Sequence, residues 1–207
     1  MTVRKPRRTA PVLAVASVVL LGACGPKYDE ATTEPVSSPA PTSVAERGKS
    51  PSELAAKIRF EIKEHAEGMI GGPNLGLALQ CGELSGSMMK CSATFKDQTV
   101  QIDARVYDYS PGKTFDTYKQ DITAKARFLV RDQVHREFHE SIMAFQNGGP
   151  LGADDVLRCD KMPEVTTVRL GVDDEWVDTG IRCYHYGGTL TTTKHLKVMS
   201  KDIGFHD

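Results

Sequence analysis

Apolar side chains recur at three- and four-residue intervals in two stretches of the chain, which is the spacing of one helix face. The first stretch consists of Leu54, Ile58, Ile62, Ala66 and Met69. A shift of 76 residues gives the second stretch, which consists of Val130, Val134, Phe138, Ile142 and Phe145. The pattern therefore predicts two amphipathic helices, each with one buried face.

The ends of both stretches are typical of helix termini. Ser50 can cap the first helix, because Pro51 suits the first helical position and Glu53 completes a capping box. Gly-Gly-Pro follows each stretch, at residues 71–73 and 148–150, and would end the helix.

The residues after each helix alternate between apolar and polar, as in half-buried strands. In the first half, the alternating apolar positions are Val100, Ile102, Ala104 and Val106, and a turn at residues 96–98 joins them to residues 90–95. In the second half, the strand-like segments are residues 164–170, 175–186 and 189–200. We therefore expect each helix to lie across a small antiparallel sheet, with a longer hairpin in the second half.

Residues 114–129 carry a further helix-like pattern. One helical face would hold Phe115, Tyr118, Ile122, Ala126 and Leu129. This face rotates before Val134, which indicates either a kink near residues 130–131 or two separate helices. We expect the segment to be a helix that connects the two halves.

Two pairs of cysteines follow the two helices in the same order. Cys81 and Cys91 come after the first Gly-Gly-Pro, and Cys159 and Cys183 come after the second. Helix face, terminator and cysteine pair recur together, so the sequence predicts an internal repeat. The expected fold class is α+β, with a first module at residues 50–110 and the connecting helix and second module at residues 111–207.

Four cysteines allow three pairings, and the repeat selects one disulfide within each module, Cys81–Cys91 and Cys159–Cys183. Modules of this size bury only marginal cores, so covalent cross-links are expected. A zinc site made of the four cysteines is the alternative, but it would lack any C-x-x-C pair. No cofactor is expected.

The N-terminal residues have the pattern of an export signal. Arg4, Lys5, Arg7 and Arg8 precede an uncharged, strongly apolar run that is too short to span a bilayer. The run ends in Leu-Gly-Ala-Cys, which resembles the lipobox of bacterial lipoproteins. That resemblance implies cleavage after residue 23 and a diacylglyceryl group on Cys24, which would anchor the protein to the cell membrane.

Residues 24–49 are rich in Pro, Ser and Thr, and we expect them to form a disordered tether. The whole chain has a net charge of −1, which gives no support to nucleic-acid binding. Removal of residues 1–23 would take away four basic residues and no acidic residue, leaving a net charge of −5. The lipid, rather than the protein surface, would therefore hold the protein at the membrane.

The pattern of helix, Cys81, Cys91, a Thr-Phe-Lys-Asp turn and an alternating strand is similar to small cysteine-paired domains of actinobacterial or phage-borne surface lipoproteins of unknown function. Residues 91–97 carry the best match, and the second module departs from it through its longer hairpin. The resemblance supports the fold and an extracytoplasmic location, and it implies no catalytic residues.

Two short motifs suggest chemistry. His135 and His139 would share a helix face, as metal ligands can, but Arg136 occupies the position where a zinc protease has its base. Asp178, Thr179 and Gly180 match the motif of aspartic proteases, which need a second carboxylate that the repeat does not supply. We therefore expect no catalytic site and no metal, and a hydrolase is the weakest of the alternatives.

Aromatic residues in the second hairpin are candidates for a contact surface. They are Trp176, Tyr184 and Tyr186, and aromatic side chains are enriched at binding interfaces. The function expected is non-catalytic binding of another envelope protein, which would be superinfection exclusion if a phage encodes the chain. The alternative is a carrier that holds an apolar ligand or lipid between helix and sheet, lined by Ile58, Ile62, Val134 and Phe138.

Overall fold

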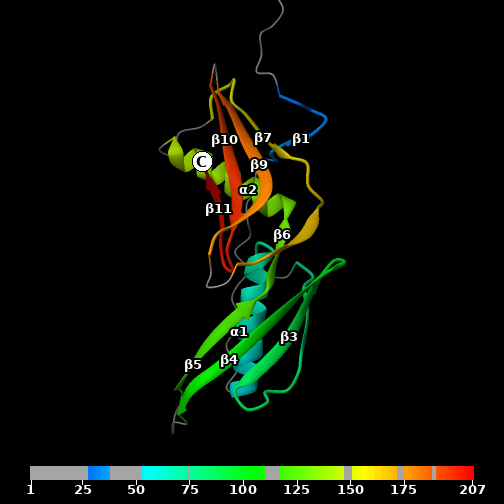
Figure 1. The fold of residues 1–207 in the computed structure, drawn as a ribbon, viewed down its shortest axis with the longest axis vertical. Coiled ribbons are helices and arrows are strands. Elements are labelled where there is room, and N and C mark those ends of the chain that lie inside the picture. Colours follow the sequence, from blue (N-terminus) through cyan, green and yellow to red (C-terminus); the bar gives the residue numbers. More distant parts are fainter. Residues whose placement is uncertain are drawn as a thin grey trace, which may run out of the picture.

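The fold is mostly β-sheet (Figure 1). The computed structural model describes residues 28–37, 53–73, 75–110, 117–146, 151–171, 175–187 and 190–207. These residues form eleven strands and two helices, so the structure is closer to an all-β protein than to the expected α+β class. The expected signal peptide, Cys24, the cap at Ser50 and the second Gly-Gly-Pro at residues 148–150 lie outside the described residues.

The first half consists of one helix and a four-stranded antiparallel sheet. Its elements are α1 (Leu54–Met69), β2 (Ala78–Cys81), β3 (Met88–Phe95), β4 (Gln98–Ser110) and β5 (Thr117–Ala124), with the strand order β2-β3-β4-β5. The predicted helix face is correct, because Ile58, Ile62, Ala66 and Met69 are buried against the sheet. The predicted turn joins β3 to β4 at Lys96 and Asp97.

The second half consists of one helix and a five-stranded antiparallel sheet. Its elements are α2 (Arg131–Phe145), β7 (Val156–Asp160), β9 (Val177–Gly187), β10 (Leu190–Val198) and β11 (Ile203–His206). These strands are ordered β7-β9-β10-β11, and β1 (Thr33–Pro35) adds a fifth strand beside β7. The helix face again packs on the sheet through Val134, Phe138 and Ile142, whereas Phe145 is 84% exposed.

The helix expected at residues 114–129 is wrong for the part that the structure describes, and Phe115 lies outside it. Residues 117–130 contain β5 and β6 (Ala126–Val130). Tyr118, Ile122 and Ala124 lie at alternating positions, which fits a strand as well as a helix. Pairing with the long strand β4 decides between the two, and it moves the end of the first sheet from residue 110 to Ala124.

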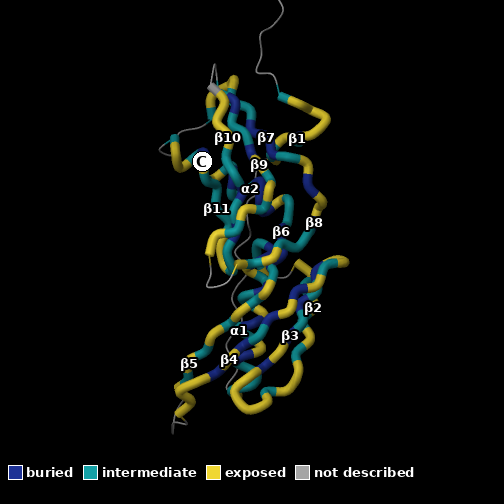
Figure 2. The backbone as a smooth tube through the Cα atoms, viewed as in Figure 1, coloured by how far each residue is buried: buried dark blue, intermediate teal, exposed yellow. Residues whose placement is uncertain are grey.

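A two-stranded ribbon joins the halves (Figure 2). It consists of β6 and β8 (Val165–Arg169), so the segment expected as a hairpin between Cys159 and Cys183 pairs instead with β6. Phe128 enters the first core and its neighbour Leu129 enters the second, because successive side chains of a strand point to opposite faces. One strand therefore contributes to both cores.

Arg127 is fully buried at this junction. Its guanidinium donates to the carbonyl oxygens of Met199 and Asp202 at 2.9 and 2.5 Å. Burial lowers the pKa of Arg127 to about 10, so the side chain remains charged at neutral pH. These hydrogen bonds tie β6 to the turn between β10 and β11.

Candidate functional site

Each of the two larger sheets contains one of the disulfides that the sequence predicted, between β2 and β3 in one and between β7 and β9 in the other. Cys81 lies directly opposite Cys91, and Cys159 lies directly opposite Cys183. The disulfides Cys81–Cys91 and Cys159–Cys183 have Cα–Cα distances of 4.1 and 4.0 Å. Such short distances are typical of the non-hydrogen-bonded pairs of an antiparallel ladder. The presence of two disulfides supports an oxidising, extracytoplasmic environment.

Part of the expected tether packs on the second half. Residues 28–37 are described, and β1 pairs antiparallel with β7, with Glu34 opposite Cys159. The N–H of Val36 donates to the carbonyl of Leu157 at 3.0 Å, and the N–H of Lys161 donates to the carbonyl of Thr32 at 2.9 Å. This corrects the expectation of disorder for these ten residues, because their backbone groups complete the ladder at an otherwise open edge.

Side chains of β7 hold the N-terminal segment in place. The buried Arg158 donates to the hydroxyl and the carbonyl of Thr33 at 2.8 and 2.9 Å. Its guanidinium also lies 4.4 Å from the centre of the Tyr28 ring, a cation–π contact. Tyr28 in turn packs on Tyr186, with ring centres 5.3 Å apart.

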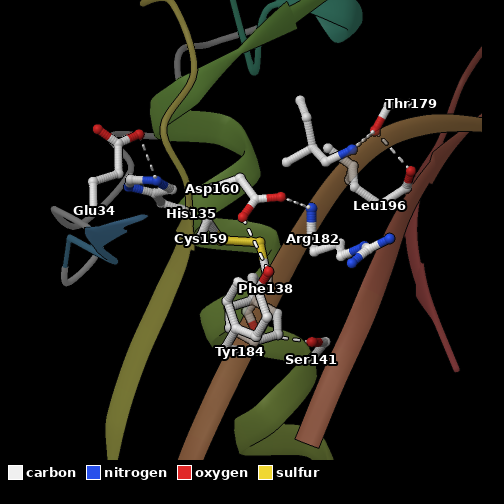
Figure 3. The surroundings of a disulfide bond; sticks show 12 residues. Glu34, His135, Phe138, Ser141, Cys159, Asp160, Thr179, Arg182, Tyr184 and Leu196 are labelled. Atoms are coloured by element: carbon white, nitrogen blue, oxygen red, sulfur yellow. Dashed lines mark hydrogen bonds and ion pairs between the residues drawn. A yellow bond between two sulfur atoms is a disulfide. The ribbon is translucent and has the colours of Figure 1, made fainter. Parts of the chain in front are cut away.

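Glu34 faces the helix of the second half (Figure 3). One carboxylate oxygen lies 3.4 Å from Nε2 of His135, and the other lies 3.7 Å from the guanidinium of Arg131. Nδ1 of His135 accepts a hydrogen bond from the N–H of Ser37 at 3.4 Å. The proton of the neutral ring therefore belongs on Nε2, facing Glu34.

Burial holds the pKa of His135 below its ordinary value, and the nearby Glu34 carboxylate opposes this shift. Only 2% of His135 is exposed, so the neutral ring is favoured near neutral pH. His139 is partly buried one helical turn further on. Within the described segments, no three His, Cys, Asp or Glu side chains are placed to hold a metal ion.

The three aromatic residues predicted as a contact surface differ in exposure. Tyr186 is buried beneath Tyr28, which corrects its assignment to an exposed surface. Tyr184 stacks on Tyr186 and donates its hydroxyl proton to Asp160 at 3.1 Å. Trp176 packs on His206 and remains 41% exposed. The burial of Tyr186 could not be predicted from the sequence, because the residue that packs on it, Tyr28, is more than 140 residues away in the chain.

The Asp-Thr-Gly motif lies at a distortion of β9. The Asp178 carboxylate accepts from the N–H of Gly180 at 2.8 Å, and Gly180 has a φ of +77°. The hydroxyl of Thr179 donates to the carbonyl of Leu196 at 2.8 Å. The motif residues are thus bound within the strand pair β9–β10, whose register shifts nearby.

The edge strand β2 of the first sheet borders a groove. Its volume is about 640 Å³, and it lies between α1 and β2. The groove is lined by Arg59, Phe60, Lys63, Leu77, Leu79, Gln80 and Cys81. Leu77, Leu79 and Cys81 are partly exposed there, and Arg59 and Lys63 are exposed. No residue of this groove except Cys81 was singled out from the sequence, because the edge becomes visible only once strand order is known.

Comparisons with known proteins give no relative. No family model, curated protein or solved structure matches the chain. Among the described residues, neither helix has the length and apolarity needed to cross a membrane.

Proposed function

We propose that the protein is a lipid-anchored binding protein of the cell envelope that presents its first half away from the membrane. The observation that carries this proposal is the packing of residues 28–37 on the second sheet. Tyr28 is the fourth residue after Cys24, the expected site of lipid attachment. The second half would therefore lie at the membrane, and the first half would be distal.

The reach of the chain supports this orientation. Residues 24–28 span at most about 14 Å even when fully extended. A lipid on Cys24 would thus hold β7 and β1 near the bilayer surface. The first sheet lies at the opposite end of the molecule from β1 (Figure 1), so it would project outward.

The two halves are, in this proposal, copies of one unit. Each has a helix followed by four strands in the order of their succession along the chain, with β8 inserted in the second copy. In each, the disulfide joins the first two strands of that order at directly opposing positions. A duplication would leave one copy near the membrane and the other free to bind a partner.

The carrier alternative has no observation in its favour. Ile58 and Ile62 are fully buried in the first core, and Val134 and Phe138 are fully buried in the second. The groove beside β2 is lined by other residues. We therefore keep binding of a protein partner as the proposed function.

Lipid attachment is tested by metabolic labelling with an alkyne fatty acid and by membrane fractionation. The protein should be labelled and sediment with membranes, and Cys24→Ser should abolish both. Labelling that persists in Cys24→Ser, or an unlabelled wild-type protein, would contradict the anchor.

Which half binds the partner is tested with a photo-cross-linking amino acid at one of two exposed positions, Gln80 in the first half and Arg182 in the second. A discrete protein adduct should form from position 80 and not from position 182. Adducts from position 182 alone would place the binding face on the wrong half.

A further inference from the structure

The strands β2 and β7 occupy the same place in their sheets. Each is the first strand of its four-stranded order and carries the first cysteine of its disulfide. Superposing Cys81 on Cys159 matches Leu79 with Leu157 and Gln80 with Arg158. The two edges can therefore be compared residue by residue.

The backbone of β2 offers the same hydrogen-bonding groups that β7 uses to hold β1. The N–H of Gly82 donates to the carbonyl of Lys90 at 3.0 Å, so Gly82 faces β3. Along an antiparallel strand the backbone N–H and C=O groups of successive residues point alternately to the two sides. The backbone groups of Leu79 and Cys81 therefore point away from β3. Their equivalents, Leu157 and Cys159, lie in the ladder with β1.

These groups are covered in one half and open in the other. Cys159 is completely buried beside β1, whereas Cys81 is partly exposed in the groove. Within the described part of the chain, no strand other than β3 pairs with β2. An exposed edge of this kind can add an extended peptide through main-chain hydrogen bonds.

The charges beside the two edges indicate what kind of strand would fit. In the second half, Glu34 of the added strand faces His135 of α2. The shift of 76 that aligns the helices puts Arg59 at the position of His135 and Lys63 at that of His139. Both cations line the groove beside β2. Lys63 pairs with Glu67 of its own helix at 3.6 Å, whereas no ion pair among the described residues neutralises Arg59.

We propose that the free edge of β2, together with Arg59 and Lys63 of α1, binds an extended acidic segment of a partner protein, which joins the sheet as β1 joins β7. A carboxylate opposite Cys81 would face Arg59, as Glu34 opposite Cys159 faces His135. This inference specifies the kind of partner that the proposed binding function would have. It rests on that function only for the place in the cell where binding would occur.

Charge disfavours two other occupants. Residues 38–52 of the chain contain one acidic and two basic residues, so they do not complement Arg59 and Lys63. Two copies joined edge to edge through β2 would bring like charges together. The segment that covers β7, residues 28–37, has three acidic residues and no basic one.

The test is a titration of the purified, oxidised, ¹⁵N-labelled protein with a synthetic peptide that copies residues 28–37. Amide signals of Leu79 and Cys81 should shift and gain protection from exchange as peptide is added. A peptide with Gln in place of Glu34 should bind more weakly. The protein can be taken from whichever cell fraction contains it, so failure of the lipid anchor would not affect the result.

Variants on one helix make the test specific. Arg59→Glu should weaken the affinity for the peptide by about tenfold, because a charge repulsion replaces an attraction. Arg59→Gln should have a smaller effect in the same direction. Lys57→Glu makes the same charge change about 200° away around the helix and should leave binding within about twofold.

Each contrary outcome has a defined meaning. If Arg59→Glu binds like the wild type, or if the shifts fall on Leu157 and Cys159, the proposed site is wrong. If Leu79 and Cys81 are protected without peptide in dilute monomer, the chain covers its own edge. If their protection rises with protein concentration alone, a second copy is the occupant. Any of these results would overturn the proposal.

Discussion

The strands β2 and β7 each carry the first cysteine of a disulfide, but they have different neighbours. β1 lies along β7, where Cys159 is completely buried, whereas Cys81 on β2 is partly exposed. The helix position beside these edges holds the buried His135 in one half and the exposed Arg59 in the other.

The difference shows how an added strand changes the chemistry of the same scaffold. When the edge is covered, the facing side chain is removed from water, and a neutral imidazole is favoured over a fixed charge. When the edge is open, a guanidinium can stay hydrated and remain available to an acidic partner. The predictions below test this contrast.

Loss of a disulfide should have the largest single effect on stability. Each should stabilise its half by about 3 kcal/mol. The loops they close span 10 and 24 residues, so removing Cys159–Cys183 should cost about 0.8 kcal/mol more than removing Cys81–Cys91 from loop entropy. Burial of Cys159 and Cys183 adds to this difference.

Double Cys→Ala variants, followed by urea unfolding, measure both effects. An equal loss in the two variants, or a greater loss for Cys81 and Cys91, would contradict the expected effects of loop length and cysteine burial.

Arg158 should matter far more than its counterpart Gln80. Arg158→Ala removes two hydrogen bonds to Thr33 and the contact with Tyr28, and should destabilise the second half by about 2 kcal/mol. Gln80→Ala, at the exposed equivalent position, should change stability by less than about 0.5 kcal/mol. Urea unfolding with amide exchange at Leu157 measures both, and similar losses would show that β1 adds no stability.

Acid should loosen the covered edge specifically. Burial lowers the pKa of His135, so the unfolded chain binds its proton more readily than the folded protein. Stability should therefore fall as pH decreases below about 6.5 and should stop falling below the folded-state pKa. The groups that face this ring are Glu34, Arg131 and Asp132.

His135→Gln should reduce this pH dependence, measured as amide exchange along β7 between pH 8 and pH 5. The amides of β2 serve as the internal control, because no His lines the groove beside that strand. A variant that retains the full pH dependence would assign the effect to another group.

The smallest effect is expected at the ion pair that links the two halves. Lys96, in the turn after β3, pairs with Glu164 just before β8, and both side chains are about half exposed. Glu164→Gln should change the stability little, since exposed ion pairs are weak and screened by salt. Unfolding at low and high salt checks this, and a large loss would mean that the pair fixes the orientation of the halves.

Local sequence was sufficient for several elements. The faces of α1 and α2, the hairpin of β3 and β4 and both disulfides could be predicted, because their signals lie within short segments or recur in both halves. Tyr118, Ile122 and Ala126 fit both a helix and a strand, so their structure could not be predicted from pattern alone. The ladder with β4 and the pairing of β6 with β8 decided it.

The sequence by itself determined the buried faces of the two helices and the cysteine pairing, since both follow from spacing along the chain. Tertiary structure alone decided which edge is covered. Residues 28–37 carry no strand pattern, and they become a strand because β7 presents unpaired backbone groups and Arg158 holds Thr33. Edge pairing depends on which strands end as neighbours in space, and no local pattern records that.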